Sequence, residues 1–257
     1  MTVIRTVMLL LLLALCSGIA TADSLQIQPA ESARAEIETA AFPVHDAEHY
    51  TVKCLGITCG HLILSSSIVD FEGRPAYHIV MTGRNSKFFN RIYKINIRID
   101  SWVDARTQSS LVYESVTTEK GETSTERHEI NWDEGTVRSV EDGVEKTLEF
   151  SSAEPVLDPL AFIFRLQALA KVGGGEITLT LLTTRGPVQT IATVHEPKTK
   201  RTSRGRRLLL EIKPQPADGK MFSKKGQFSL WVDPQDSTTL YILDFKLPFG
   251  HLISRID

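Results

Sequence analysis

The densest group of chemically active side chains in this sequence is a basic run. The segment "KTKRTSRGRR" crowds six cations into ten positions, and it contains no aromatic residue. Such a run can contact an anionic surface, such as phosphate head groups or an acidic partner, or it can be a solvated hairpin loop. Nucleic acid is a poor candidate, since nothing in the run can stack on bases. The predicted contact residues are Lys198, Lys200, Arg201, Arg204, Arg206 and Arg207.

Histidines offer the next candidates for chemistry. His45 and His49 lie four residues apart, which suits a metal site on a helix, but the segment lacks a helical context and a third ligand. We therefore expect a solvated arm and no metal. Glu126, His128 and Trp132 share one parity, so a strand would place a carboxylate, an imidazole and an indole on one face. We interpret this set as a structural ladder.

Catalytic motifs are absent from the sequence. It contains no G-x-S-x-G, H-E-x-x-H, Walker or G-x-G-x-x-G pattern. The glycines at 173–175 follow a predicted helix instead of preceding one, so they do not form a phosphate cradle. These observations predict a protein that is not an enzyme and that holds no cofactor.

The beginning of the chain predicts export. Arg5 precedes the short apolar run "TVMLLLLLALCSGIA", and "ATA" supplies small residues before Asp23. Residues 1–22 are thus predicted to be a cleaved signal peptide, because the run is shorter than a membrane span needs. Residues 23–48 are expected to form a loose arm and residues 49–257 a single β-rich domain. The mature chain would lie in the periplasm without a transmembrane span.

Two cysteines remain after the predicted cleavage, and an exported protein can bridge them. Cys54 and Cys59 would lie about 16 Å apart in one continuous strand, whereas a disulfide needs Cα atoms about 4.4–6.8 Å apart. The bridge requires "LGIT" to be a turn, which Gly56 permits. The alternative is a pair of small apolar side chains in strands.

Most of the remaining sequence has the pattern of a β-protein. An apolar content of 42% and a charged content of 23% suit a globular chain, and the net charge of -2 exerts no general attraction on polyanions. In "RIYKINIRIDSWV", Tyr93, Ile95, Ile97 and Ile99 alternate with polar residues. This alternation predicts an antiparallel sheet with one dry face and one wet face. About a dozen such segments follow one another through short turns, including "DG" at 142–143. "NSKFFNRI", with Phe88 and Phe89, is either a short helix or a wide loop.

One nearly all-apolar helix interrupts the strands. Asp158 and Pro159 form a start signal, and the glycines at 173–175 end the helix, which is predicted over about 159–172. Such a helix must lie against a sheet, and one helix covers so many strands only if the sheet curls around it. The fold class is therefore mostly β, a single curved antiparallel sheet (half-barrel or barrel) with the helix on its concave side. Asp158 would cap the helix, and Arg165 would reach solvent from its flank.

These segments together resemble a family. "YTVKCLGITCGHLIL", "GRPAYHIVMTGRNSKFFNRIYKINIRIDSWVDARTQ", "DPLAFIFRL" and "FKLPFGHLISRID" are similar to an uncharacterised domain-of-unknown-function family of exported bacterial proteins. The resemblance implies a periplasmic β-rich domain and no known activity. The expected shape is similar to that of lipoprotein carriers of the LolA and LolB type, which is an analogy of architecture.

The leading hypothesis is a non-catalytic envelope protein whose helix and sheet enclose a lipid-like ligand. The predicted ligand-binding residues are Leu160, Phe162, Phe164, Leu166 and Leu169. A second hypothesis is an adaptor that binds an envelope protein through Phe88, Phe89 and the basic run. A third is a hydrolase of unfamiliar geometry.

Overall fold

The computed structural model describes residues 41–91, 93–151, 154–170, 174–217, 227–235, 239–247 and 250–257. The predicted signal peptide and the predicted arm up to residue 40 lie outside the described residues. The same holds for residues 171–173, which include the first glycine of the predicted helix end.

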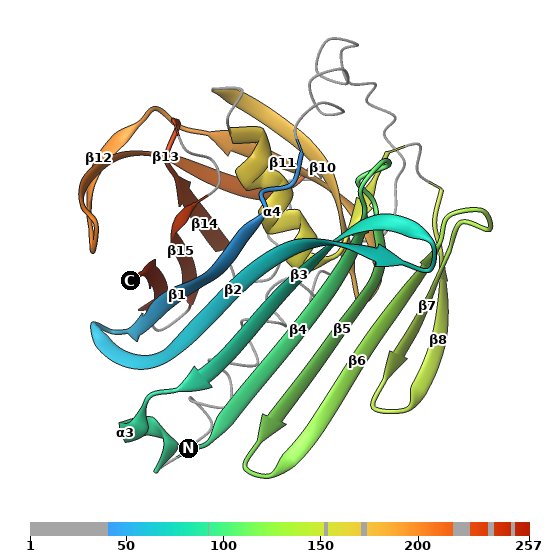
Figure 1. Ribbon diagram of the computed structural model, residues 1–257, viewed down its shortest axis with the longest axis horizontal. Coiled ribbons are helices and arrows are strands. Elements are labelled where there is room, and N and C mark those ends of the chain that lie inside the picture. The colour runs from blue at the N-terminus through green and yellow to red at the C-terminus, as the bar shows by residue number, and fades with distance from the viewer. Residues whose placement is uncertain are drawn as a thin grey trace.

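One sixteen-stranded sheet organises the described chain (Figure 1). Neighbouring strands follow the order β8-β7-β6-β5-β4-β3-β2-β1-β16-β15-β14-β13-β11-β10-β9, with β12 paired to β13. The first half of the chain contributes β1 (His45–Cys54), β2 (Ile57–Phe71), β3 (Arg74–Asn85), β4 (Ile95–Asp104), β5 (Ser110–Glu119), β6 (Glu122–Asn131), β7 (Thr136–Glu141) and β8 (Val144–Glu149). The second half contributes β9 (Val156–Leu157), β10 (Gly175–Thr183), β11 (Gly186–Val194), β12 (Lys198–Thr202), β13 (Gly205–Pro216), β14 (Gln227–Val232), β15 (Leu240–Leu247) and β16 (Gly250–Ile256).

The sheet curls into an open barrel, which confirms the predicted fold class (Figure 1). Its two edge strands, β8 and β9, share no ladder of hydrogen bonds. Val137 of β7 instead packs in one cluster with Val156 of β9 and Leu182 of β10. The pairs are antiparallel except for β9 with β10, which run parallel. Side-chain packing thus brings the two ends of the sheet together at one place.

Alternation along β4 shows how the sequence assigns the two faces. Ile95, Ile97 and Ile99 are buried in the main core, as the sequence pattern predicted. Arg98 lies between them in sequence and is exposed. Because side chains alternate along a strand, one side of the sheet faces the core and the other faces solvent over much of its area. We call these the inner and outer faces.

Tight turns keep consecutive strands adjacent. The predicted "DG" turn joins β7 to β8, and both Asp142 (φ 48°) and Gly143 (φ 81°) are left-handed. A two-residue turn with two positive φ values matches the twist of the strands that it connects. The sequence of turns therefore produces a meander, with each strand beside its predecessor from β1 to β8.

Helix α4 (Pro159–Leu169) lies inside the curl of the sheet (Figure 1). It contacts β4, β9, β10 and β14, and all its residues are buried. The prediction that Arg165 reaches solvent is therefore wrong, because its side chain is only 2% exposed and lies 5.8 Å from the ring centre of Phe42. Strands surround the helix on several sides, so its polar residues Arg165 and Gln167 are enclosed as well.

Regular structure begins earlier than the sequence indicated. Strand β1 starts at His45, within the predicted arm 23–48, and Phe42 is buried with its ring 5.2 Å from that of Tyr77. The ambiguous "NSKFFNRI" contains a single helical turn, α3 (Lys87–Asn90). Phe88 is 65% exposed there and meets the ring of Phe89 edge-on.

Candidate functional site

The basic run forms a β-hairpin made from β12 and the start of β13. Figure 1 shows this hairpin extending beside the barrel as a two-stranded ribbon. Lys200 lies directly opposite Arg207, and Arg201 lies directly opposite Arg206. Arg204 occupies the turn. Like charges opposite one another destabilise a strand pair, so the hairpin holds its cations together against their mutual repulsion.

Contacts with the sheet hold the hairpin near its start and at its turn. The Lys198 ammonium lies 3.7 Å from a Glu211 carboxylate oxygen, and the Lys200 ammonium lies 3.9 Å from the ring centre of Trp231. At the turn, the Ser203 hydroxyl donates to the backbone carbonyl of Ile256 at 2.6 Å. These three contacts anchor the ribbon near its start and at its tip.

The remaining cations of the hairpin are available to a partner. Arg201, Arg204, Arg206 and Arg207 are exposed, and within the described chain none has a carboxylate within ion-pair distance. Leu208, the next residue, is 54% exposed. The structure therefore gathers the predicted contact residues on one two-stranded ribbon held against the barrel, with an exposed apolar side chain beside the charges.

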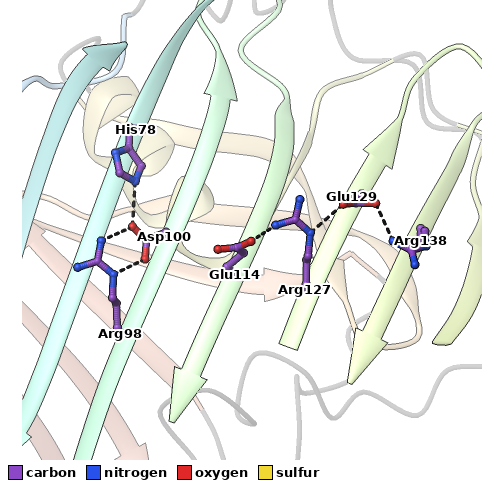
Figure 2. Close-up of polar contacts among 7 residues, drawn as sticks. All are labelled: His78, Arg98, Asp100, Glu114, Arg127, Glu129 and Arg138. Atoms are coloured by element: carbon purple, nitrogen blue, oxygen red, sulfur yellow. Dashed lines mark hydrogen bonds and ion pairs between the residues drawn. The ribbon is translucent and has the colours of Figure 1, made fainter. Parts of the chain in front are cut away.

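A second charged region crosses the outer face of β3–β8, where opposite charges alternate. Figure 2 shows Asp100 accepting two hydrogen bonds from Arg98, both at 2.7 Å, and lying 2.9 Å from His78. The imidazole of His78 also stacks on Trp102 at 4.6 Å. Arg98 donates hydrogen bonds to both carboxylate oxygens of Asp100, so the negative charge of Asp100 is balanced by its neighbours.

The same face continues as a chain of ion pairs toward the edge strand (Figure 2). Arg127 bridges Glu114 and Glu129, and Arg138 bridges Glu129 and Glu145. Hydrogen bonds from Arg127 and Arg138 lower the pKa of Glu129, and Arg138 lowers that of Glu145. Charges that satisfy one another in this way hold the exposed strands together and leave little net attraction for a ligand.

The His–Asp pair on this face lacks the partner that a hydrolase would need. Ser67 lies directly opposite His78 in the register, but among the described contacts no hydrogen bond joins them. A nucleophilic serine is activated by a hydrogen bond to its base. The geometry therefore gives the hydrolase hypothesis no support at this position.

Asp158 connects helix α4 to β4 and to the start of β5. One carboxylate oxygen accepts from the backbone N–H groups of Leu160 and Ala161, and the other accepts at 2.6 Å from the hydroxyls of Ser101 and Ser110. Complete burial raises the pKa of Asp158, and these hydrogen bonds oppose the rise. This is the predicted helix cap, with two serine donors that the sequence did not reveal.

The predicted ligand-binding residues form part of the main core. Each is at most 5% exposed, and together they pack against the inner face: Leu160, Phe162, Phe164, Leu166 and Leu169. Gln167 is fully buried among them, and neither of its amide atoms has a hydrogen-bond partner in the part of the chain that the structure describes. The helix thus carries one uncompensated polar group inside an apolar environment.

The two histidines of the N-terminal pair separate onto opposite faces. The segment is a strand, and a register shift between His45 and Glu48 changes which residues point inward. His45 lies 5.5 Å from the ring of Phe164, whereas His49 is exposed on the outer face. No group of three potential metal ligands occurs among the described residues.

Glu126 and His128 share the inner face as predicted, and their side chains meet at 2.7 Å. The ring of His128 also stacks on Tyr113, at 5.6 Å. Trp132 lies beyond the end of β6, and its indole N–H donates to the carbonyl of Ser110. The set is thus a part-buried pair on β6, with a separate indole hydrogen bond beyond the end of that strand.

Cys54 and Cys59 flank the turn at Leu55 and Gly56, and both are free thiols. The turn that a bridge would require is present, yet Cys54 faces Ile57 across the strands instead of Cys59. Burial raises the pKa of the Cys59 thiol to about 11, and the neighbouring Cys54 adds to the rise. In this structure Cys54 and Cys59 are two partly buried thiols in adjacent strands.

Sequence reasoning missed the outer-face groups that lie on different strands. Arg98 and Asp100 were visible as polar positions of one strand, but His78 joins them only through the register of β3 with β4. Likewise, the basic run was compatible with a hairpin, but nothing local in the sequence places that hairpin beside Trp231. Cross-strand pairing, which the sequence does not state, creates these sites.

Comparisons with known proteins place the chain in a family. No curated protein matches the sequence significantly. A crystal structure of a β-barrel-like protein of the domain of unknown function DUF1849 from Brucella abortus is similar, with a TM-score of 0.53 and 11% sequence identity. The match covers 83% of this chain and 97% of that one, and it bears on the fold alone. Within the described residues, no helix is long and apolar enough to cross a bilayer. The family model for "Protein of unknown function (DUF3108)" matches residues 49–257, so the chain belongs to the DUF3108 family.

Proposed function

We propose that this protein is an exported, non-catalytic component of the cell envelope that docks on an anionic lipid surface through its basic hairpin. The observation that carries the proposal is the pairing of Lys200 with Arg207 and of Arg201 with Arg206 on one ribbon whose arginines are exposed. A negatively charged surface would relieve the repulsion between these cations, and binding would gain that free energy.

Lipid head groups suit the hairpin better than a folded acidic protein. Arg201 and Arg206 share one face of the ribbon and Arg204 lies at its turn, so a flat layer of phosphates can contact these three cations at once. Leu208 lies beside them and is exposed, and an apolar side chain next to cations can enter the interface between head groups and acyl chains. An acidic protein partner would support the adaptor hypothesis instead.

Vesicle binding tests the proposal. Each basic residue near an anionic membrane contributes about 1 kcal/mol, so the triple variant R201Q/R204Q/R206Q should bind vesicles of anionic phospholipid about a hundredfold more weakly. Added salt should weaken the binding of the native chain. Vesicles of phosphatidylcholine alone, which have no net negative charge, should bind little.

The matched control is R74Q/K87Q/R91Q, which removes three exposed cations elsewhere on the chain. It changes the net charge equally and should leave most of the binding intact. Equal losses in both triples would mean that net charge alone drives association. An unchanged affinity in the hairpin triple would refute the proposed docking element.

A second candidate function is the carriage of a lipid-like ligand beside α4. Gln167 favours it, since a buried amide without partners would gain about 1–3 kcal/mol from a ligand carbonyl or hydroxyl. Native mass spectrometry of gently purified protein would detect a bound lipid. A chain that carries no lipid, and takes none up from vesicles, would exclude this candidate without affecting the docking proposal.

A further inference from the structure

A hollow of about 440 Å³ opens on the outer face, above β1–β4. Its side chains come from four strands and from the residue that follows β16. The polar lining consists of His49, His61, Thr82, Arg84, Asn96 and Asp257. None of its lining residues belongs to the basic hairpin or to the ion pairs of Figure 2, although the turn of the hairpin reaches Ile256, next to Asp257.

Strand register aligns one set of hydrogen-bond donors across this hollow. His61 of β2 lies opposite Arg84 of β3, and Arg84 lies opposite Asn96 of β4. Residues in direct register share a face, and adjacent strands are about 4.8 Å apart. A guanidinium, an imidazole and an amide are therefore close enough to bind one group with several oxygen atoms.

Arg84 has no carboxylate partner among the described residues, unlike Arg98, which Asp100 holds on the same face. Guanidinium groups bind phosphate oxygens through two parallel hydrogen bonds, and the amide and imidazole can donate to the third oxygen. These three side chains form the anion-binding end of the hollow.

Asp257 provides a negative charge at the side of the hollow opposite Arg84. Its backbone N–H donates to the carbonyl of His49 at 2.8 Å, and its carboxylate accepts from the Thr51 hydroxyl at 2.6 Å. These two bonds fix the carboxylate beside β1, two strands or about 10 Å from the strand of Arg84. The long Arg84 side chain can cover part of this separation.

We propose that the hollow binds a small zwitterion, a phosphate ester that carries an amine. The phosphate binds Arg84, His61 and Asn96, and the ammonium binds Asp257. Phosphoethanolamine is the simplest molecule of this class, and the same chemistry occurs free or as a lipid head group. This site goes beyond the docking role, which uses a different element.

Calorimetric titration with phosphoethanolamine, inorganic phosphate and ethanolamine tests the proposal on the full chain. Phosphoethanolamine should bind more tightly than either fragment. R84Q should weaken its binding about tenfold or more, since it removes hydrogen bonds to a charged group. D257N should abolish the preference for phosphoethanolamine over inorganic phosphate. R74Q changes an exposed arginine of the same strand outside the hollow and should bind normally.

The hairpin triple R201Q/R204Q/R206Q separates this site from membrane docking and should bind phosphoethanolamine as the native chain does. Vesicles containing phosphatidylethanolamine then identify the source of the ligand. If free phosphoethanolamine releases the triple variant from these vesicles, the ligand of the hollow is a lipid head group. If the variant binds free phosphoethanolamine but not the vesicles, the ligand is a soluble molecule. Absence of phosphoethanolamine binding, or equal binding by R84Q, would overturn the proposal.

Discussion

At the scale of single residues, Asp158 shows how one side chain joins two parts of the fold. It caps α4 and accepts two serine hydroxyls from the sheet while fully buried. D158A should lower the free energy of unfolding by about 2 kcal/mol or more, because it removes the cap and leaves buried donors without an acceptor. D158N keeps an oxygen for the helix N–H groups and should lose less. Urea unfolding of both variants gives the comparison, and equal losses would contradict this role.

The raised pKa of Asp158 also predicts a dependence on pH. The folded state binds this proton more tightly than the unfolded state, where the pKa is near its usual value. The folded state is stabilised by binding this proton more tightly. That contribution is fully present below the usual pKa of an aspartate, and it is lost as the pH rises through the pKa of Asp158 in the folded state. The native chain should gain stability relative to D158N as the solution is acidified through this range. If the difference in unfolding free energy between the native chain and D158N stays constant with pH, the pKa of Asp158 is not raised in the folded state.

The thiol of Cys59 gives a second prediction at this scale. With a pKa of about 11, it is almost entirely protonated near neutrality, and only the thiolate reacts with alkylating agents. In the folded chain, alkylation of Cys59 near neutral pH should be about tenfold slower, or more, than in urea. Peptide mass spectrometry after timed quenching measures both rates. Equal rates would show that burial does not protect the thiol.

At the scale of elements, helix α4 is the part that the sequence described best. Asp158 and Pro159 marked its start, and its apolar composition required a surrounding sheet. The prediction for Arg165 failed because sequence periodicity assigns a wet face to a helix without showing how many strands enclose it. The bulge between His45 and Glu48 was equally invisible, since a register shift depends on the partner strand.

Core packing of this helix can be measured by truncation. Phe162 is fully buried, so F162A should cost about 3–5 kcal/mol of unfolding free energy through lost contacts and a cavity. F88A, on the exposed turn α3, should change it by no more than about 0.5 kcal/mol. Thermal or urea unfolding resolves this contrast. A small effect of F162A would mean that a space beside the helix accommodates the loss.

At the scale of the whole molecule, the sheet separates two environments. Its inner face encloses the helix and most of the apolar core, whereas its outer face carries the compensated ion pairs and the hollow at Arg84. The sequence predicted the curved sheet because alternation and turn residues repeat along most of the chain. It did not predict the outer-face sites, because each depends on side chains from strands whose alignment only the fold defines.

Hydrogen–deuterium exchange with and without anionic vesicles tests most directly whether the basic hairpin docks on a lipid surface. We predict slower exchange of the hairpin amides, over residues 198–208, when vesicles are present. Exchange across the ion-paired strands β5–β7 should remain unchanged. Protection of those strands in place of the hairpin, or no change anywhere despite bound vesicles, would contradict the proposed docking surface.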